Sequence, residues 1–312
     1  MADTPASAPM PSKSATAGPA MSGAGNSRFK GAGNYLALIP FHAYVGLFLV
    51  LPTLIVTIGA FSTSDGQLTL QNIAAMFTTP AFVSSFIKSL QLAVITAILG
   101  AVFGGLLSWA VLRGDPNGIV RQLVISASGV LAQFGGVMLA FAFLATFGFN
   151  GFVTQFIQGT LGVGVNGYDP QWLYTMAGLA VVYTYFQIPL MLIVFLPSLD
   201  GLRQEWYDAS ASLGGSPWSF WRHVGGPILA PSFLGALLLL FTNAFSAYAT
   251  AQALISQGCV LVTQEIACQM QSEIVLGREN VGKALALGMI VIVSAVMLLY
   301  AYVQRRASRW VK

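Results

Sequence analysis

Residues 89–112 of the chain read SLQLAVITAILGAVFGGLLSWAVL and contain no formally charged side chain. A helix needs about 20 mostly apolar residues to cross the hydrocarbon core of a bilayer, so this stretch is long enough for one complete span. Three more uncharged stretches, 122–168, 170–199 and 284–304, are each long enough for at least one span. The pattern predicts an all-α integral membrane protein.

The composition of the whole chain points the same way. Of the 312 residues, 56% are hydrophobic and 8% are charged, whereas about a quarter of the residues of a soluble domain are charged. The net charge is a small +4, and the charged residues lie at the ends of apolar segments rather than in a basic stripe that could bind nucleic acid. The composition argues against a soluble fold and against a nucleic-acid partner.

The N-terminal segment has a different character. Residues 1–34 consist largely of Ala, Ser, Pro and Gly, and such a segment has too little apolar surface to fold. It also lacks the basic start and short apolar core of a cleavable signal peptide. We therefore expect a disordered cytoplasmic tail at 1–34, a transmembrane domain at 35–312, and membrane targeting by the first apolar helix.

The apolar stretches predict six spans, and the basic residues predict their orientation. If both termini are cytoplasmic, all but three of the 14 Lys and Arg residues, namely Lys88, Arg278 and Lys283, fall on the cytoplasmic side. Basic residues are enriched on that side of membrane proteins, so we expect this orientation. The predicted spans are 36–62, 87–112, 120–147, 172–198, 233–256 and 283–304.

The connection between the fourth and fifth predicted spans is the most informative loop. Residues 200–231 read DGLRQEWYDASASLGGSPWSFWRHVGGPILAP. Leu202, Trp206, Ala209 and Leu213 recur at helical spacing and predict a short amphipathic helix with one apolar face. A loop that merely connects two spans, with its tryptophans at the lipid headgroups, explains the pattern as well.

The same loop carries the signals of a turn and a second helix. Gly214 stands where a helix takes a left-handed terminating residue, Ser216 can cap the next helix, and Pro217 can open it. Gly225, Gly226 and Pro227 are expected to end this second helix before the next span begins. The sequence therefore predicts two short helices joined by a tight turn.

Residues 208–231, DASASLGGSPWSFWRHVGGPILAP, resemble the EAA loop of binding-protein-dependent permeases. Asp208–Ser210 stand at the E-A-A positions, Gly214 stands at the motif's glycine, and Val224–Pro227 match its V/I-x-L-P end. The chain departs from the pattern with Asp for Glu, Ser for the second Ala, and Gly226 for Leu. The core from Leu213 to Trp218 is similar to the spermidine/putrescine-type branch of the family.

This resemblance implies a six-helix type I ABC importer transmembrane domain in the inner membrane. It implies three kinds of partner, which are a second permease subunit, two copies of an ABC ATPase, and an extracytoplasmic solute-binding protein. The chain would be no enzyme, would hold no metal or cofactor, and would leave ATP and Mg²⁺ to the partner ATPase. The residues expected to couple to that ATPase are Asp208, Ala209, Ser210, Leu213, Gly214, Ser216, Pro217 and Phe220.

Uncharged polar residues inside the predicted spans are candidates for the solute pathway. Each could equally make a hydrogen bond between helices. The resemblance puts polyamine-like cations, phosphonates and similar small polar solutes first, and a sugar or glycerol-phosphate second. The spans have almost no carboxylates, which argues against an ion-coupled secondary transporter. The pathway candidates are Gln133, Gln187, Asn243 and Tyr248.

Two further patterns are weighed against simpler explanations. Residues 277–284, GRENVGKA, nearly match a phosphate-binding loop, but Ala284 replaces the required hydroxyl residue and no strand precedes the segment, so we expect no nucleotide site. Cys259 and Cys268 would be about 13 Å apart on one continuous helix, too far for a disulfide. A bond between them therefore requires a bend, which the β-branched stretch VLVT favours, and the sequence leaves it open.

Overall fold

The computed structural model describes residues 39–63, 65–115, 117–160, 169–255, 258–271 and 279–307. Apart from an isolated bridge between Ser62 and Leu68, these residues form helices and connecting turns. Six helical segments among them are long and apolar enough to cross a membrane: Ile39–Ala60, Pro80–Leu112, Gly136–Gly159, Met176–Asp200, Pro217–Ser246 and Glu279–Arg305. The all-α membrane class is confirmed.

The chain divides into two units, Met1–Pro52 and Thr53–Lys312. In the first unit, residues 39–45 are helical and the π-helix η1 follows at Gly46–Val50. The predicted tail at 1–34 lies outside the described residues. Helix α2, Leu51–Ala60, leads into the second unit.

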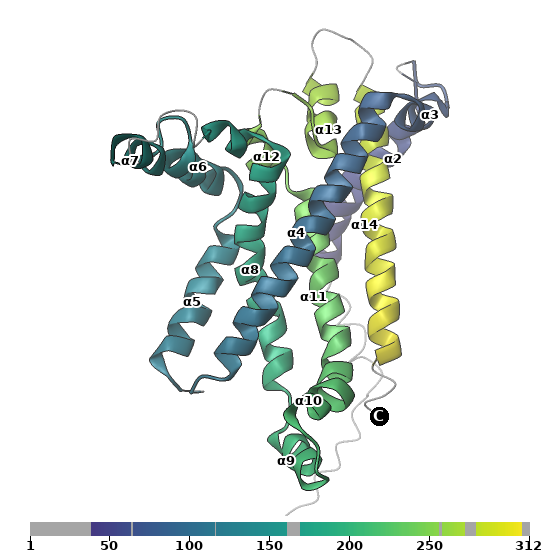
Figure 1. Ribbon diagram of the computed structural model, residues 1–312. Coiled ribbons are helices and arrows are strands. Elements are labelled where there is room, and N and C mark those ends of the chain that lie inside the picture. Colours follow the sequence, from purple (N-terminus) through teal and green to yellow (C-terminus); the bar gives the residue numbers. More distant parts are fainter. Residues whose placement is uncertain are drawn as a thin grey trace, which may run out of the picture. The chain divides into compact units, whose positions relative to one another are not determined.

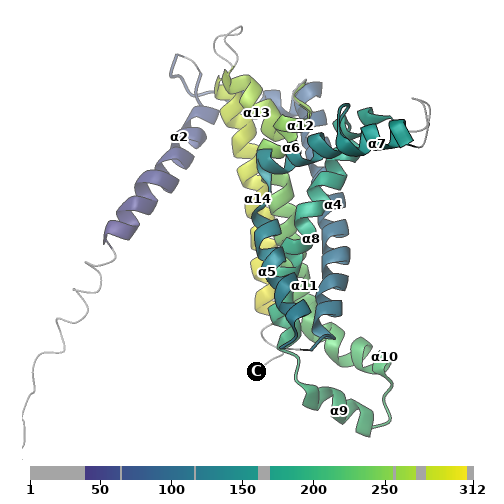
Figure 2. The same ribbon diagram turned by 90° about the vertical axis from the view of Figure 1, so that its left-hand side faces the viewer.

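The second unit contains the remaining helices (Figure 1). Their bounds are α3 Gln71–Thr78, α4 Pro80–Leu112, α5 Ile119–Gln133, α6 Gly136–Phe147, α7 Phe152–Thr160, η2 Pro170–Tyr174, α8 Met176–Asp200, α9 Gln204–Ser212, α10 Pro217–Phe220, η3 Trp221–Gly225, α11 Gly226–Ser246, α12 Ala249–Leu254, α13 Val262–Gln271 and α14 Glu279–Ala307. Figures 1 and 2 place α9 and α10 at the end of this unit opposite α13.

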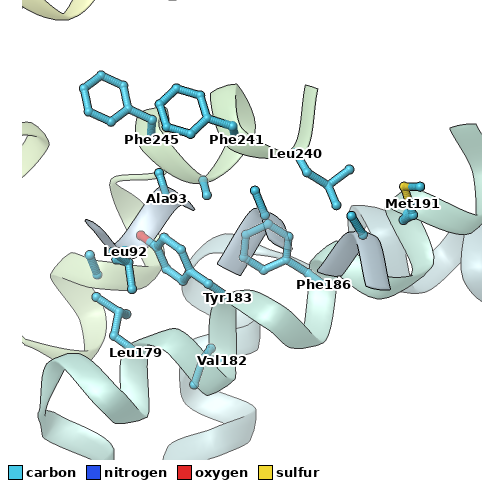
Figure 3. Packing of buried hydrophobic residues seen from close by; sticks show 14 of the residues in the cluster. Leu92, Ala93, Leu179, Val182, Tyr183, Phe186, Met191, Leu240, Phe241 and Phe245 are labelled. Carbon is cyan, nitrogen blue, oxygen red and sulfur yellow. The ribbon is translucent and has the colours of Figure 1, made fainter. Parts of the chain in front are cut away.

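The core lies where α8 packs against α4 and α11. Figure 3 shows Tyr183 and Phe186 of α8 between the side chains of the two neighbouring helices. Gly100 and Gly104 let α4 approach closely, because a Cβ on Gly104 would lie 2.5 Å from Cβ of Met191. Small residues let membrane helices pack closely where lipid supplies no hydrophobic drive, and they do so at this crossing.

The predicted span 120–147 is wrong as a single helix. The chain leaves helical geometry at Phe134 and Gly135, and Gly136 adopts a left-handed φ of +68°. Helix α5 therefore ends at Gln133 and packs along α8, whereas α6 turns away and packs against α12 (Figure 1). Apolar composition continues across the break, so hydropathy alone could not locate it.

The predicted span 233–256 is also wrong at both ends. Gly225 and Gly226 do not terminate the preceding helix, because the π-helix η3 carries the chain from α10 directly into α11. The helix stops at Ser246, where Ala247 adopts an extended conformation, and α12 follows as a separate short helix. One helical segment, Pro217–Ser246, thus connects the loop to the bundle.

Cys259 and Cys268 form a disulfide, with their Cα atoms 6.6 Å apart. Helix α13 begins only at Val262, so Cys259 lies in a turn before the helix and Cys268 lies within it. Half of the VLVT stretch is therefore turn and half is helix, which supplies the bend that the bond requires. The backbone N–H of Val262 also donates to Ser89 Oγ on α4 at 2.9 Å, tying this segment to the bundle.

Candidate functional site

The turn between α9 and α10 is built as the sequence predicts. Gly214 has a φ of +79°, a left-handed conformation that glycine adopts without the steric cost of a Cβ atom. The N–H of Gly214 donates to the carbonyl of Ala211 at 2.9 Å, and that of Gly215 donates to Ser210 at 2.9 Å. This pair of bonds is the Schellman motif, which satisfies the last carbonyls of a helix. Helix α9 consequently ends at a fixed position.

The second helix starts with a side-chain cap. Ser216 is extended, and its Oγ accepts a hydrogen bond from the backbone N–H of Ser219 at 3.2 Å. Pro217 occupies the first turn, where its missing N–H costs no hydrogen bond. Gly215 is constrained by space, because a Cβ there would lie 2.7 Å from the carbonyl oxygen of Ser210. The two helices therefore meet at a turn whose geometry is locally determined.

An aromatic contact that sequence reasoning missed holds α9 against α10. The ring centroids of Tyr207 and Phe220 are 5.3 Å apart in an edge-to-face arrangement, and Phe220 is buried. Phe220 also contacts Trp221, at 5.7 Å between centroids. Tyr207 lies off the apolar face proposed from the spacing, so a search for one apolar stripe passed over it. The pair sets the angle between the helices.

Most of the predicted apolar face of α9 is exposed. Leu213 is 90% exposed and Trp206 is 37% exposed, while Leu202, before the helix, packs against the core. On the neighbouring helix, Trp218 is 74% exposed. Large apolar side chains exposed together on a capped helix pair are typical of an interaction surface.

Asp208 lies on this exposed helix pair. The side chain of Gln204 donates to Asp208 Oδ1 at 3.3 Å, and the hydroxyl of Ser212 donates to the Asp208 carbonyl at 2.9 Å. Within the part of the chain that the structure describes, no basic group lies within ion-pair distance of its carboxylate. Asp208 and the neighbouring Ala209 are both exposed and accessible to another protein.

Farther along the bundle, two interruptions of helical structure lie against each other. The hydroxyl of Thr250, in α12, donates to the carbonyl of Gly136 at 3.1 Å. The hydroxyl of Tyr183, in α8, donates to the carbonyl of Ala247 at 2.8 Å. The bond from Tyr183 satisfies a carbonyl that the α11–α12 break releases, which an apolar environment requires, and the bond from Thr250 ties α12 to the start of α6. The α5–α6 break and the α11–α12 break thus form one junction.

Three of the four pathway candidates flank this junction. Gln133 is the last residue of α5, Asn243 lies in the last turn of α11, and Tyr248 lies between α11 and α12; all three are exposed. Gln187 has a different setting, because it is fully buried and its Nε2 donates to Thr96 Oγ1 of α4 at 2.9 Å. Of the two alternatives for Gln187, its geometry is that of a hydrogen bond between helices.

The segment that nearly matches a phosphate-binding loop is helical where it is described. Gly277 and Arg278 lie outside the described residues, while Gly282 and Lys283 belong to α14. Gly282 packs against Met270 and Gln269 of α13. The described part of the segment is thus the first turn of a helix, and Ala284 follows it where the phosphate-binding loop has a hydroxyl residue.

Comparison with known proteins agrees with this architecture. Residues 168–309 match the family model described as "Binding-protein-dependent transport system inner membrane component". A probable sulfate transport system permease protein cysT from Nephroselmis olivacea is 27% identical over 203 residues, covering 65% of this chain and 68% of the relative. The sulfate transport system permease protein CysT of Escherichia coli (strain K12) is 25% identical over 207 residues, covering 66% and 69%.

Solved structures share the fold. A bacterial ABC transporter involved in import of the acidic polysaccharide alginate superposes with a TM-score of 0.66 at 14% identity, covering 90% of this chain and 96% of that one. The methionine ABC transporter MetNI gives a TM-score of 0.53 at 15% identity, covering 73% and 96%. The family model thus matches the C-terminal part of the chain, and the solved structures show that the chain shares the fold of ABC transporter membrane subunits.

The expected likeness to the spermidine/putrescine-type branch is not supported, because the relatives are sulfate permeases. The physical reason lies in the residues that suggested it. The core from Leu213 to Trp218 forms the end of one helix and the cap of the next. Those residues meet a conformational requirement of the loop and carry no information about the solute.

Proposed function

We propose that the chain is the permease subunit of an ATP-driven importer and that α9 and α10 dock on a partner ATPase. The observation that carries the proposal is the exposed apolar surface of this capped helix pair, continuous with the bundle through α11. The residues proposed for the docking surface are Asp208, Ala209, Ser210, Leu213, Gly214, Ser216 and Pro217. Phe220, which the resemblance also put among the coupling residues, is buried and holds α10 against Tyr207 of α9.

The proposed assembly contains a second permease, two copies of the ATPase and an external solute-binding protein. A solved relative in fold is a bacterial alginate ABC transporter in complex with an alginate pentasaccharide-bound periplasmic protein. ATP and Mg²⁺ belong to the ATPase in this proposal, and the permease itself carries no cofactor and no catalytic residue. Arg121, Arg203 and Arg222 lie near the coupling end, which supports a cytoplasmic location for that end.

The mechanism we infer is mechanical. Helices α10, η3 and α11 form one segment from Pro217 to Ser246, so a tilt of the docked loop moves the far end of α11 as well. That far end is the α11–α12 break, which contacts the α5–α6 break. Rigid-body switching of this kind converts a small movement at one site into the opening of another. The junction beside Gln133, Asn243 and Tyr248 is therefore the proposed gate.

The solute we propose is sulfate, because the two relatives described above are sulfate transport permeases. The residues at the junction suit a small dianion, since amide N–H and phenol O–H groups donate to oxyanions. Helix α6 also begins at Gly136, and the first N–H groups of a helix favour negative charge. No feature of the described residues favours a polyamine, a sugar, a glycerol-phosphate or an ion-coupled transporter.

The test is uptake by the reconstituted assembly. The permease, its partner permease and ATPase are placed in vesicles, and radioactive sulfate is supplied with the solute-binding protein and ATP. Sulfate accumulation that requires both ATP and binding protein is expected. If a different solute accumulates in an ATP-dependent way and sulfate does not, sulfate is rejected as the substrate and the importer function is kept. ATP hydrolysis unaffected by the presence of the permease would reject the coupling role.

A further inference from the structure

A groove of about 990 Å³ lies between α4 and α8, apart from the α9–α10 loop and from the junction. Phe143 of α6 borders it. The residues on α4 are Lys88, Gln91, Leu92, Ile95, Leu99 and Phe103, and those on α8 are Met176, Ala177, Ala180, Val181, Thr184, Tyr185 and Ile188.

The groove follows from the way the two helices cross. At Gly104 they touch, since a Cβ there would lie 2.6 Å from the carbonyl oxygen of Ile188. Toward the end that carries Lys88, the facing residues of α8 are the small Ala177 and Ala180. Close contact at one end and small side chains at the other leave a hollow that begins near Lys88 and closes near Phe103.

Polar groups are concentrated at the mouth of the groove. Lys88 is exposed and makes no ion pair or hydrogen bond within the described part of the chain, and Gln91 lies one turn deeper. Below them the wall is apolar, because the hydroxyl of Thr184 is bonded to the carbonyl of Ala180 in its own helix at 2.8 Å. Ile95 and Val181 on the rims are 50% and 51% exposed.

The depth of the apolar wall matches one leaflet of a bilayer. From Gln91 to Phe103 the helix rises by about 18 Å, and half of the hydrocarbon core is about 15 Å thick. A charged mouth above an apolar wall of this length is complementary to an anionic amphiphile. Its phosphate would meet the ammonium group of Lys88 at the interface, and one acyl chain would lie along the groove.

We propose that this groove binds an anionic phospholipid of the leaflet on the side opposite the coupling loop. A free oxyanion is a poor occupant, because desolvating it requires several donors and the groove supplies one cation at its mouth. The proposal needs only that the bundle lies in a membrane and does not rest on the transported solute. Basic pockets between transmembrane helices are known to recognise acidic headgroups by this electrostatic attraction.

The experiment measures which lipids stay with the protein. The full chain, purified with its partner subunits, is reconstituted with equal amounts of phosphatidylglycerol and phosphatidylcholine, and retained lipid is counted by native mass spectrometry. We expect phosphatidylglycerol to be retained about fivefold more than phosphatidylcholine, the ratio expected for one lysine near a membrane surface. Lys88→Gln should reduce this ratio to about one.

Two further variants test whether lipid retention depends on the groove or on positive charge anywhere on the protein. Ala180→Trp fills the apolar wall and should abolish retention of both lipids. Lys283→Gln removes a cation that does not line the groove and should leave the ratio unchanged. An unchanged ratio in Lys88→Gln, or full retention in Ala180→Trp, overturns the proposal. A different result would assign the groove to a protein interface. In that case the unaltered chain retains no lipid, and Lys88→Gln no longer co-purifies with the second permease.

Discussion

Arg121, at the start of α5, forms an ion pair with Asp200, the last residue of α8, at 2.6 Å between Nη2 and Oδ2. The Arg121 side chain is 14% exposed and that of Asp200 is 39% exposed. Asp200 opens the loop at 200–231, which contains the proposed docking helices, and α5 leads to the break beside Gln133. The pair therefore gives the loop a second mechanical connection to the junction, separate from α11.

This connection predicts an uncoupled variant. Arg121→Ala should change stability by no more than about 1 kcal/mol, because the pair is partly solvated. It should nevertheless lower solute uptake relative to ATP hydrolysis, since movement of the loop no longer reaches α5 directly. The double exchange Arg121→Asp with Asp200→Arg should recover uptake, measured beside hydrolysis in the same vesicles. Equal uptake per ATP in Arg121→Ala and the unaltered chain would show that the pair transmits nothing.

Gly214 is predicted to be the most sensitive position of the loop. Nothing lies within 4 Å of a Cβ built there, so the penalty comes from its positive φ alone. A β-branched residue is strained by on the order of 1–2 kcal/mol in that conformation. Gly214→Val should leave membrane insertion and pairing with the second permease intact, but reduce recovery of the ATPase and abolish uptake.

Matched controls separate backbone strain from loss of contact. Gly214→Asn should be mild, because asparagine tolerates the left-handed region. Gly201→Ala changes a glycine with an ordinary φ of −73° and should have little effect. Asp208→Ala should also be milder than Gly214→Val. Normal uptake by Gly214→Val at normal expression would falsify the coupling role proposed for the loop.

The close contact between α4 and α8 predicts a variant that lowers the stability of the bundle and leaves the α9–α10 loop unchanged. Gly104→Val would place side-chain atoms against the carbonyl oxygen of Ile188, a backbone group that cannot move aside. Overpacking of this kind costs about 1–3 kcal/mol. Thermal unfolding in detergent should show a lower midpoint for this variant. Gly129→Ala in α5, where nothing lies within 4 Å, serves as the control and should not lower the midpoint.

The orientation inferred from basic residues predicts the results of reporter fusions. Reporters after Lys312 and within 113–119 should signal cytoplasm, and a reporter at 160 should signal the outside. The Cys259–Cys268 disulfide fits the same orientation, because its end of the bundle would then face an oxidising compartment. Finding Lys312 and residue 160 on the same side would reject the topology.

The sequence by itself determined the membrane class and the shape of the turn between α9 and α10. Uncharged stretches of span length reveal a membrane helix because the bilayer excludes charge. The turn at Gly214 and Ser216 was predictable because its hydrogen bonds join residues at most five positions apart. Such local bonds depend on residue type and order, which the sequence contains.

Tertiary structure alone decided the junction and the setting of the polar residues. Thr250 meets Gly136, and Gln187 meets Thr96, across separations of 114 and 91 residues. Whether a membrane glutamine lies at a pathway or between helices depends on which helix faces it. Tyr207 likewise gained its role only when α10 folded back to place Phe220 against it. Hydropathy is the same for all these arrangements, so only packing between distant segments could distinguish them.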